Sequence, residues 1–197
     1  MLPQPLKNIY ATELDIQRVD WRPELHREYL NLGEMEIIVA LVRSVRAQTM
    51  TEIGCRDGRT ARVLLDNVPS LYRYVGIDVP IDYHPALPSQ RTEMVEEPGH
   101  LAIADPRFEL VIRPRGSLDL DELEPSDAIF IDGDHSRRVV AHDSALAWGA
   151  VRNPGVIIWH DYFNDHINDV TDVLCGLGAA GWPIKHIAGT WLAFCRT

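Results

Sequence analysis

Thr51-Glu-Ile-Gly-Cys-Arg-Asp-Gly58 is the stretch of sequence that decides the fold. The run Ala47–Ile53 predicts a short strand, and Arg59–Leu65 predicts the start of a helix. The turn between them carries Gly54 and Gly58, which let the backbone approach a ligand closely at a helix N-terminus. Strand, glycine turn and helix in this order begin an α/β unit that binds nucleosides.

An acidic residue, Asp78, ends the second predicted strand, Tyr74–Asp78. A carboxylate at this place in a nucleoside-binding sheet takes the ribose hydroxyls. The dinucleotide fingerprint requires Gly-x-Gly-x-x-Gly, whereas this chain has Glu52-x-Gly54-x-x-x-Gly58. This order lacks the tight pyrophosphate turn, so the sequence favours a ligand without phosphates.

Composition predicts one globular domain over residues 1–197, with an N-terminal arm or helix at 1–32 and a core at 33–197. The chain is 46% apolar and 24% charged, which is typical of a folded domain. Its net charge of −10 argues against nucleic acid or an anionic membrane as the main partner.

Cellular location is predicted from the cysteines and from the apolar stretches. Cys55, Cys175 and Cys195 are an odd number without metal-type spacing, which indicates free thiols in a reducing compartment. The N-terminus lacks a signal-peptide pattern, and the longest apolar stretch, Ile37–Val42, is too short to span a bilayer. We therefore expect a cytoplasmic protein.

The remaining chain alternates strands and helices. Further strands are predicted at 108–112, 127–132 and 156–161, helices at 24–32, 33–46, 136–151 and 167–177, and a closing hairpin at 183–188 and 190–196. Asn153-Pro154-Gly155 predicts a turn, and residues 80–106 predict a surface loop of the lid type, with a short helix near 89–96. The pattern predicts a mostly parallel sheet with one antiparallel edge strand.

Carboxylates close four of the five strands before the hairpin, namely Glu52, Asp78, Asp132 and Asp161. A carboxylate at the end of an apolar strand is costly unless something pairs with it. Because ligands of open α/β sheets bind beyond the carboxyl ends of the strands, four acids there favour a ligand site over helix caps.

Asp132, His160 and Asp161 form a candidate metal site, because adjacent strand ends lie about 5 Å apart. Oxygen ligands suit magnesium, calcium or manganese, and His160 shifts the preference toward manganese, iron or zinc. The alternative is that Asp132 and Asp134 cap the helix starting near Ser136, while His160 bonds to nearby backbone.

Two further side chains near the strand ends have chemistry of interest. His135 follows the acids, and an imidazole with a pKa of about 6.5 can accept a proton from a hydroxyl near neutral pH. Its alternative role is to position the cofactor. Cys55, in the glycine turn, is read as a small side chain packed beside a ligand rather than as a nucleophile.

At this point the chain resembles the class I S-adenosylmethionine-dependent methyltransferases. Glu52–Gly58 looks like their first motif and Val75-Gly-Ile-Asp78 like their second. Phe130-Ile-Asp-Gly-Asp-His-Ser136 and Pro154-Gly-Val-Ile-Ile-Trp-His-Asp-Tyr162 are similar to the small O-methyltransferases of the cephalosporin-hydroxylase-like and macrolide-sugar type. His186-Ile-Ala-Gly-Thr-Trp-Leu-Ala-Phe194 resembles their terminal hairpin, so the likeness covers about residues 33–196.

The resemblance implies a Rossmann-like, doubly wound, mostly parallel seven-stranded sheet with a C-terminal antiparallel hairpin. It implies that Gly54 and Gly58 shape the cofactor turn, that Asp78 holds the ribose, and that residues near Ser117 approach the adenine. Together with the strand-end residues, the expected cofactor contacts are Glu52, Gly54, Cys55, Gly58, Asp78, Ser117 and Asp132.

The family comparison also bears on the metal and on the base. In metal-dependent relatives the ion is held at the positions of Asp132 and Asp161. This chain differs from the catechol type at Tyr162, where the family has asparagine, and at His135, where it has a catalytic lysine. It differs from the sugar type at His160, where the family has an acid.

The expected function is methyl transfer from S-adenosylmethionine to a hydroxyl of a small molecule. Asp132 and Asp161, with His160, would hold Mg²⁺ or Mn²⁺, and His135 would accept the proton. Alternatives are an NAD-dependent dehydrogenase, a non-catalytic protein that binds a nucleoside or a partner protein, and metal-assisted hydrolysis. Acceptor and oligomeric state stay open, and the five tryptophans could serve a homo-oligomer interface or the core.

Overall fold

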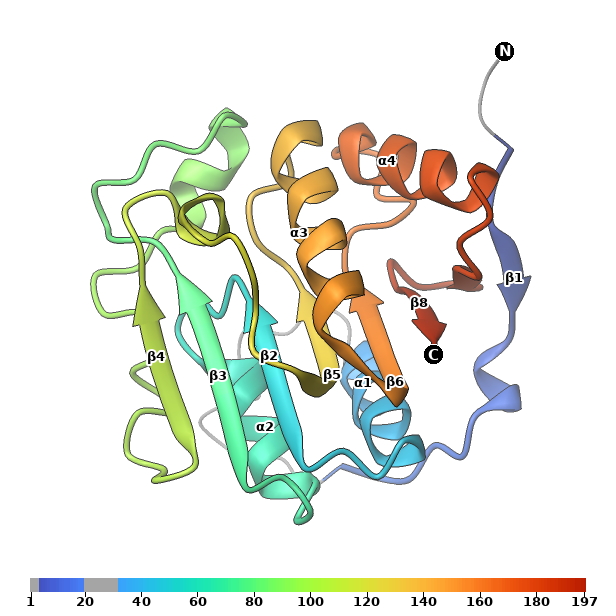
Figure 1. The fold of residues 1–197 in the computed structure, drawn as a ribbon, viewed down its shortest axis with the longest axis horizontal. Coiled ribbons are helices and arrows are strands. Elements are labelled where there is room, and N and C mark those ends of the chain that lie inside the picture. The colour runs from blue at the N-terminus through green and yellow to red at the C-terminus, as the bar shows by residue number, and fades with distance from the viewer. Residues whose placement is uncertain (1–3, 20–31) are drawn as a thin grey trace.

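The computed structural model describes residues 4–19 and 32–197. Eight strands form one sheet in the order β1-β7-β8-β6-β5-β2-β3-β4 (Figure 1). The strands are β1 (Lys7–Ile9), β2 (Thr49–Ile53), β3 (Arg73–Asp78), β4 (Phe108–Ile112), β5 (Ser126–Ile131), β6 (Val151–Trp159), β7 (Lys185–Ile187) and β8 (Ala193–Arg196). The predicted α/β class, with its mostly parallel sheet and terminal antiparallel hairpin, is confirmed.

The centre of the sheet is the predicted first strand, β2, whose five residues are all buried. It lies between β3 and β5 in parallel register, with Ile53 opposite both Ile77 and Ile131. A strand with neighbours on both sides and helices on both faces is buried on both faces, and the polar residues of this one, two threonines and Glu52, are buried as well. The chain leaves it at the carboxyl edge of the sheet.

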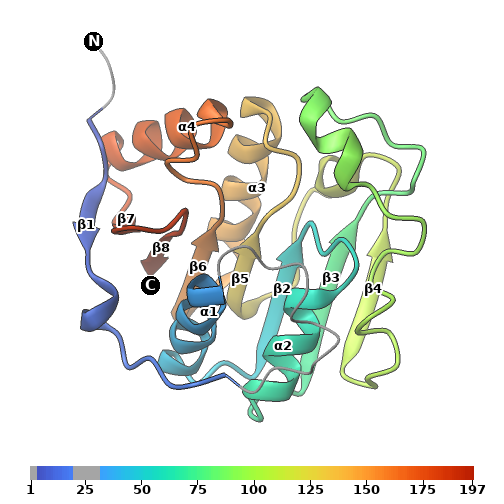
Figure 2. The ribbon, with the colours of Figure 1, turned by 180° about the vertical axis from the view of Figure 1, so that it is seen from behind.

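Helices cover both faces of the sheet (Figures 1 and 2). Helices α1 (Leu32–Ser44) and α2 (Arg59–Asn67) pack on one face, and α3 (Arg137–Ala150) and α4 (Asn168–Ala179) pack on the other. Each face has its own apolar core, to which α1 contributes Leu41 on one side and α4 contributes Leu174 on the other. Burial of these apolar stripes is the main term that holds the layers together.

The number of strands differs from the seven predicted, because residues 7–9 add β1 to the edge of the sheet. Strand β1 pairs in parallel with β7, with Ile9 opposite Ile187, and the Leu6 N–H donates to the Tyr162 hydroxyl at 3.1 Å. Three residues are too few to give a detectable alternation, so the sequence predicts an arm or a short helix here and not a strand. The helix predicted at 24–32 lies almost entirely outside the described residues.

The antiparallel strand, β8, lies between β6 and β7 and not at the edge as predicted. It pairs with both neighbours, opposing Ile158 with Phe194 and His186 with Ala193. The predicted turn at Asn153-Pro154-Gly155 is also wrong, because β6 runs through it and its register with β5 shifts there instead.

The long loop between β3 and β4 is confirmed, and its short helix is the 3₁₀ helix η3 (Pro88–Glu93). Backbone bonds tie the loop to the glycine turn: the Gly99 N–H donates to Arg56 O at 2.7 Å and the Leu101 N–H to Asp57 O at 2.9 Å. A second 3₁₀ helix, η4 (Gly116–Asp119), follows β4, and a third, η1 (Ala11–Glu13), follows β1.

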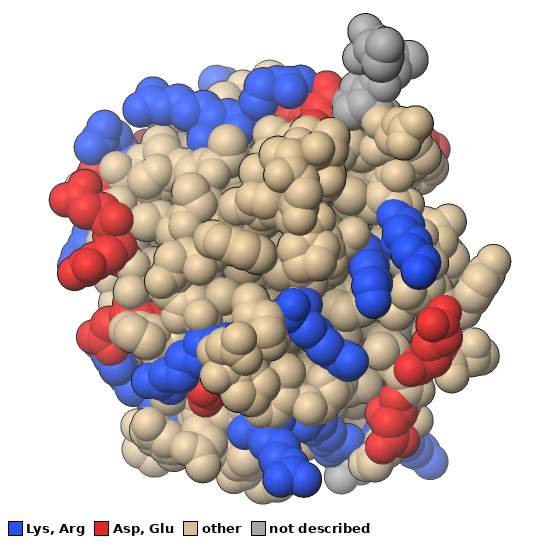
Figure 3. Space-filling view, turned by 45° about the vertical axis from the view of Figure 1, so that its right-hand side comes forward, with Lys and Arg blue, Asp and Glu red and all other residues tan. Residues whose placement is uncertain are grey.

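The surface carries both signs of charge. On the face seen in Figure 3, groups of Lys and Arg and groups of Asp and Glu lie around a broad area of uncharged residues. Within residues 4–19 and 32–197, none of the helices combines the length and the apolar character needed to cross a bilayer.

Candidate active site

A cleft of about 750 Å³ opens at the carboxyl edge of the sheet. The glycine turn after β2 and the end of β3 form one part of it, and the ends of β5 and β6 form another. The loop after β3 supplies further lining through Tyr83, Gln90 and Met94. The strand-end residues singled out from the sequence therefore line one continuous cleft.

Gly54 is required by the geometry of the turn. Its φ is +86°, and a β-carbon there would lie 2.3 Å from the carbonyl oxygen of Asp132. Its N–H donates to Ile77 O at 2.8 Å, which continues the ladder one residue past β2. Gly58 is equally constrained, with φ of +84° and a β-carbon position 2.9 Å from the backbone of Gly99. A side chain at either position would push the turn away from its neighbours.

Asp78 is fixed by two backbone donors beside this turn. The Arg56 N–H donates to its Oδ2 at 2.5 Å and the Val79 N–H donates to its Oδ1 at 2.7 Å. Burial raises the pKa of Asp78, and these hydrogen bonds partly offset the rise. The carboxyl is thus held in one orientation at the wall of the cleft.

Glu52 and Cys55 lie deeper in the same wall. Glu52 is 1% exposed, and its Oε2 accepts a hydrogen bond from the Tyr74 hydroxyl at 2.9 Å. Burial raises the pKa of Glu52 well above its usual range. Burial and the nearby Glu52 and Asp78 also raise the pKa of the Cys55 thiol far above its usual range. A thiol that keeps its proton is a poor nucleophile, which favours the packing role for Cys55.

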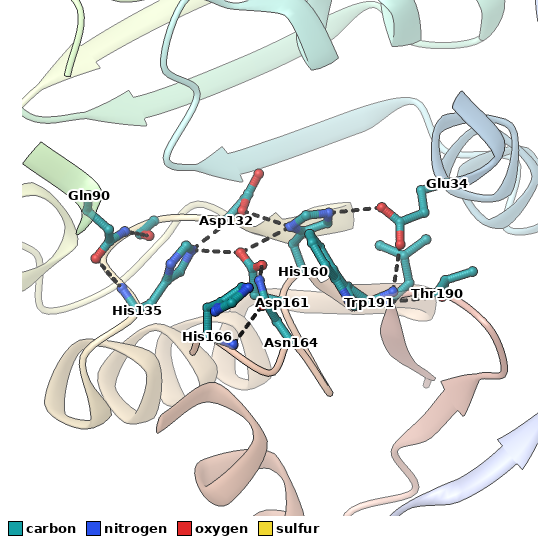
Figure 4. A network of polar contacts seen from close by, with 12 residues as sticks. Glu34, Gln90, Asp132, His135, His160, Asp161, Asn164, His166, Thr190 and Trp191 are labelled. Carbon is teal, nitrogen blue, oxygen red and sulfur yellow. Dashed lines mark hydrogen bonds and ion pairs between the residues drawn. The ribbon is translucent and has the colours of Figure 1, made fainter. Parts of the chain in front are cut away.

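Five side chains from three separate segments meet at the other part of the cleft (Figure 4), and we call them the acid–histidine cluster. They are Glu34, Asp132, His135, His160 and Asp161. His135 Nε2 lies 3.0 Å from Asp161 Oδ2 and 3.7 Å from Asp132 Oδ1. His160 Nδ1 lies 3.1 Å and 3.4 Å from the same two oxygens. The two imidazoles therefore flank one pair of carboxylates.

Charge in this cluster is shared between buried acids and imidazoles. Burial alone would lower the pKa of His135, but contacts with Asp132 and Asp161 raise it to about 10. Burial likewise opposes the charge of His160, yet Asp132, Asp161 and Glu34 raise its pKa well above the usual range. The pKa of Asp161 is lowered correspondingly, because both imidazoles outweigh the effect of its burial.

Three supporting residues of this cluster were not found from the sequence. Glu34, 5% exposed on α1, places its Oε2 3.1 Å from His160 Nε2 and accepts the Trp191 N–H on Oε1 at 2.6 Å. Gln90 accepts the His135 N–H at 3.0 Å, and Asn164 donates to Asp161 Oδ1 at 2.6 Å. The position of an acid directly before the apolar pattern of residues 35–42 was the available signal for Glu34.

Asp134 and Ser117 lie outside this cluster. Asp134 Oδ1 accepts the Ser136 N–H at 2.8 Å, just before α3, whereas the first helical N–H, of Arg137, donates to Asp169 Oδ2 at 3.0 Å. Asp134 Oδ2 accepts from the Tyr83 hydroxyl at 2.9 Å. Asp132, by contrast, faces the two histidines. Ser117 is 3% exposed on η4 and lines the cleft on the side of Asp78.

The cluster offers donors of the kind that bind a divalent cation. Asp132, His135 and Asp161 each provide one ligand atom, and these atoms lie within 4.8 Å of one another. Mixed carboxylate and imidazole donors suit manganese, iron or zinc, and the carboxylates alone suit magnesium. His135 thus enters the candidate set beside Asp132, Asp161 and His160, which were expected from the sequence.

A doubly wound sheet with a glycine turn and an acid after its second central strand defines a class of nucleoside-binding folds. The sequence model of a family described as a methyltransferase domain matches residues 51–162, more than half of the chain. The chain therefore belongs to this methyltransferase family, the S-adenosylmethionine-dependent class I. A search among proteins of curated function finds no match to the sequence.

Solved structures share the fold. A Klebsiella pneumoniae protein described as an O-methyltransferase superposes with a TM-score of 0.64 at 18% identity, over 90% of this chain and 91% of its own. A Bacillus cereus O-methyltransferase in complex with SAH gives 0.58 at 18% identity, over 88% and 85%. TomG of Streptomyces achromogenes, involved in tomaymycin synthesis and in complex with SAM, gives 0.55 at 15%, over 91% and 92%.

Proposed function

We propose that this protein transfers the methyl group of S-adenosylmethionine to a hydroxyl group of a small molecule. The observation that carries the proposal is the meeting of two sets of side chains in one cleft. The glycine turn with Asp78 suits the nucleoside, and the acid–histidine cluster suits an acceptor hydroxyl. The O-methyltransferases that share the fold support it as analogy.

The cofactor would lie along the turn after β2. In this proposal Gly54 and Gly58 let the backbone approach it, and Asp78 accepts hydrogen bonds from the ribose hydroxyls. Glu52, Cys55, Ser117 and Asp132 complete the wall of the same cleft. Because Asp78 is already held by two backbone N–H groups, little ordering of this carboxyl is needed on binding.

The reaction is a displacement at the methyl carbon. The acceptor oxygen forms a bond to that carbon while the carbon–sulfur bond breaks, and the sulfur keeps the electron pair. The protein's main task is therefore to align the acceptor oxygen with the methyl group. Asp132 and Asp161 would orient the hydroxyl, and the proton it loses would pass to His135.

A divalent ion fits the same residues. Asp132 and Asp161 would hold it together with His135 or His160, whose ring nitrogens flank the carboxylates. Such an ion, when bound, supplies positive charge that lowers the pKa of the acceptor hydroxyl. Its charge would also replace that of the imidazoles beside the two carboxylates. In that case His135 no longer needs to keep its proton and can receive one.

Calorimetry with S-adenosylmethionine and S-adenosylhomocysteine, with and without Mg²⁺ or Mn²⁺, tests the cofactor and the metal separately. Micromolar affinity for either nucleoside supports the proposal, and a metal-dependent heat that Asp161→Ala removes supports the metal site. Nucleoside binding that no metal changes favours a metal-free reaction. No binding of either nucleoside contradicts the proposal.

Turnover separates an enzyme from a binding protein. Asp132→Ala should abolish methyl transfer to a hydroxylated acceptor while the affinity for S-adenosylhomocysteine stays within about threefold, because the turn after β2 is intact. A wild-type protein that binds the nucleoside but methylates none of a panel of phenols, catechols and sugars would support a non-catalytic role.

A further inference from the structure

The turn after β6 has an unusual backbone. Asp161 and Phe163 have φ of +59° and +68°, a left-handed conformation that costs free energy in a residue with a β-carbon. They are two of the four described residues other than glycine with positive φ, and the other two, Arg46 and Arg56, are isolated. Two such residues within a span of three persist only where the surrounding structure holds them.

This backbone decides where the Asp161 carboxylate points. The hydrogen-bond ladder between β6 and β5 ends at the His160 N–H, which donates to Ile131 O at 3.0 Å, so Asp161 is the first residue beyond it. Its side chain is nevertheless buried, with Oδ2 3.0 Å from His135 Nε2 and 3.1 Å from His160 Nδ1 (Figure 4). Asp132, directly after β5, faces the same histidines without a positive φ. Contacts outside the sheet must therefore orient Asp161.

Tyr162, the middle residue of the turn, is anchored through both its backbone and its side chain. Its N–H donates to Trp191 O at 2.9 Å, which ties the turn to the β7–β8 hairpin. It is 1% exposed, and its hydroxyl accepts the Leu6 N–H at 3.1 Å and lies 3.5 Å from Cys175 Sγ on α4. Burial raises the pKa of this hydroxyl above its usual value, which suits a group that holds a position and does not exchange a proton.

The residues on either side of Tyr162 are held as well, but nearer the surface. The Phe163 N–H donates to Thr171 Oγ1 on α4 at 2.8 Å, and Asn164 Nδ2 donates to Asp161 Oδ1 at 2.6 Å. Phe163 is 56% exposed, whereas Tyr162 belongs to the apolar core on the α4 side of the sheet. Tyr162 is therefore the side chain that anchors the turn to the core.

We propose that Tyr162 is a positioning residue: it holds the left-handed turn that directs the Asp161 carboxylate into the acid–histidine cluster. The position of its hydroxyl depends on the Leu6 N–H, so the N-terminal segment supports the site from 156 residues away in sequence. A Tyr162 side chain that is free to move would let the turn relax toward negative φ and draw the carboxylate away from the histidines. The consequence for methyl transfer rests on the proposed function, whereas the consequence for the geometry of the cluster does not.

Removal of one hydroxyl tests this role in the full chain. Tyr162→Phe keeps the ring but loses the contact with the Leu6 N–H. With an acceptor that the wild type methylates, kcat should fall about 10-fold, while the affinity for S-adenosylhomocysteine stays within about twofold. Ser126→Ala is the matched control, because the buried Ser126 hydroxyl bonds to Thr51 Oγ1 at 2.8 Å at the amino end of β5. Its melting temperature should fall and its kcat should not. An equal loss of kcat in both variants would overturn the proposal.

Two variants of Leu6 test the donor. Leu6→Pro removes the N–H, whereas Leu6→Ala keeps it and shortens the side chain that packs near Gly178. Both should melt at a lower temperature than the wild type, but kcat should be about threefold lower in Leu6→Pro than in Leu6→Ala. Equal kcat in the two variants would contradict the support of Tyr162 by this N–H.

The imidazole rings of His135 and His160 report the position of Asp161 without any acceptor. Their NMR signals at constant pH, assigned with His135→Gln and His160→Gln, should move in Tyr162→Phe and stay in place in Ser126→Ala. Unchanged ring signals in Tyr162→Phe would overturn the proposal even where kcat falls. If the wild type does not bind S-adenosylhomocysteine, the proposed function fails, and the ring signals still decide whether Tyr162 positions Asp161.

The strain in the turn has its own measurement. Phe163→Gly should melt about 2–4 °C above Phe163→Ala, because glycine adopts a positive φ without cost. At an ordinary position with negative φ the order of the two variants is reversed. A melting temperature of Phe163→Ala equal to or above that of Phe163→Gly would show that the turn is not held in this conformation, and the proposal would fail.

Discussion

Two clusters of charged side chains lie at opposite edges of the sheet, and their carboxylates are neutralised in different ways. At the amino edge, Asp105 is paired with arginine: Arg62 Nη2 and Arg107 Nη2 lie 2.9 Å and 2.8 Å from its Oδ2. We call these three residues the arginine–aspartate cluster. At the carboxyl edge, the cations that face Asp132 and Asp161 within the described chain are the imidazoles of His135 and His160.

The difference between the clusters lies in whether the cation can lose its charge. A guanidinium is always protonated, so the arginine–aspartate cluster has one charge state at any pH where the protein is folded. An imidazole can release its proton when another positive charge arrives nearby. The acid–histidine cluster can therefore exchange its cation, which is what an acceptor or a metal ion requires.

Asp161→Asn should have the largest effect, because it removes the charge that both histidines share. Methyl transfer should fall by about 10³-fold, within the range expected for loss of a positioned acid or base. The affinity for S-adenosylhomocysteine should change little, as measured by calorimetry, although the melting temperature should fall because a buried charge pair is broken. A loss of nucleoside binding equal to the loss of turnover would contradict the separation of the two parts of the cleft.

Asp105→Asn should act on stability alone, since its cluster lies away from the cleft. We expect a loss of about 2 kcal/mol in the free energy of unfolding at pH 7, from two hydrogen bonds to charged groups. Arg107 and Arg62 hold the pKa of Asp105 well below its usual range. Its contribution is therefore complete above the unfolded pKa of about 3.9 and is lost as the pH falls toward the folded pKa.

Denaturant titrations of wild type and Asp105→Asn between pH 7 and pH 3 measure this contribution. The two stabilities should converge as the pH falls, and kcat/KM at pH 7 should be the same for both proteins at 25 °C. A gap in stability that stays constant down to pH 3 would show that the ion pairs are not its source.

Glu34→Gln should have a smaller effect on turnover than Asp161→Asn, because Glu34 acts through His160. The amide can still accept the Trp191 N–H, but it no longer places a negative charge 3.1 Å from His160 Nε2. Mutation of a residue that supports a metal ligand in this way typically lowers metal affinity or activity by roughly 10- to 100-fold. We expect kcat to fall about 10-fold. Calorimetry with Mn²⁺ provides the second readout, with Glu109→Gln, an exposed glutamate, as the matched control.

Arg73→Ala should have the smallest effect of the four. Its guanidinium pairs with Glu109 at 2.8 Å and with Glu124, but these side chains are 38%, 54% and 68% exposed. Exposed pairs of this kind contribute about 0–1 kcal/mol. A larger fall in the free energy of unfolding, measured by chemical denaturation, would mean that burial does not decide how much an ion pair stabilises this protein.

The sequence predicted the central strands and the adjacency of Asp132 and Asp161 because both follow from rules that act locally. Buried parallel strands read as apolar runs, and their carboxyl ends meet at one edge of the sheet. Strand β1 was not predicted because three residues are too few to show the alternation of apolar and polar residues that marks a strand. Glu34 and Gln90 were not predicted because their partners are distant in sequence: Glu34 lies 126 residues before His160 and Gln90 lies 45 before His135.

Strand β1 also bears on self-association. An unpaired strand edge is a template for another chain, and natural sheets blunt such edges with short strands, lysine and proline. Without β1, the open edge on this side of the sheet would be β7, the first strand of the hairpin whose turn carries Trp191. With it, the edge is three residues long, begins at Lys7 and follows Pro5. The segment that escaped prediction therefore blunts this edge of the sheet as a template for edge-to-edge aggregation.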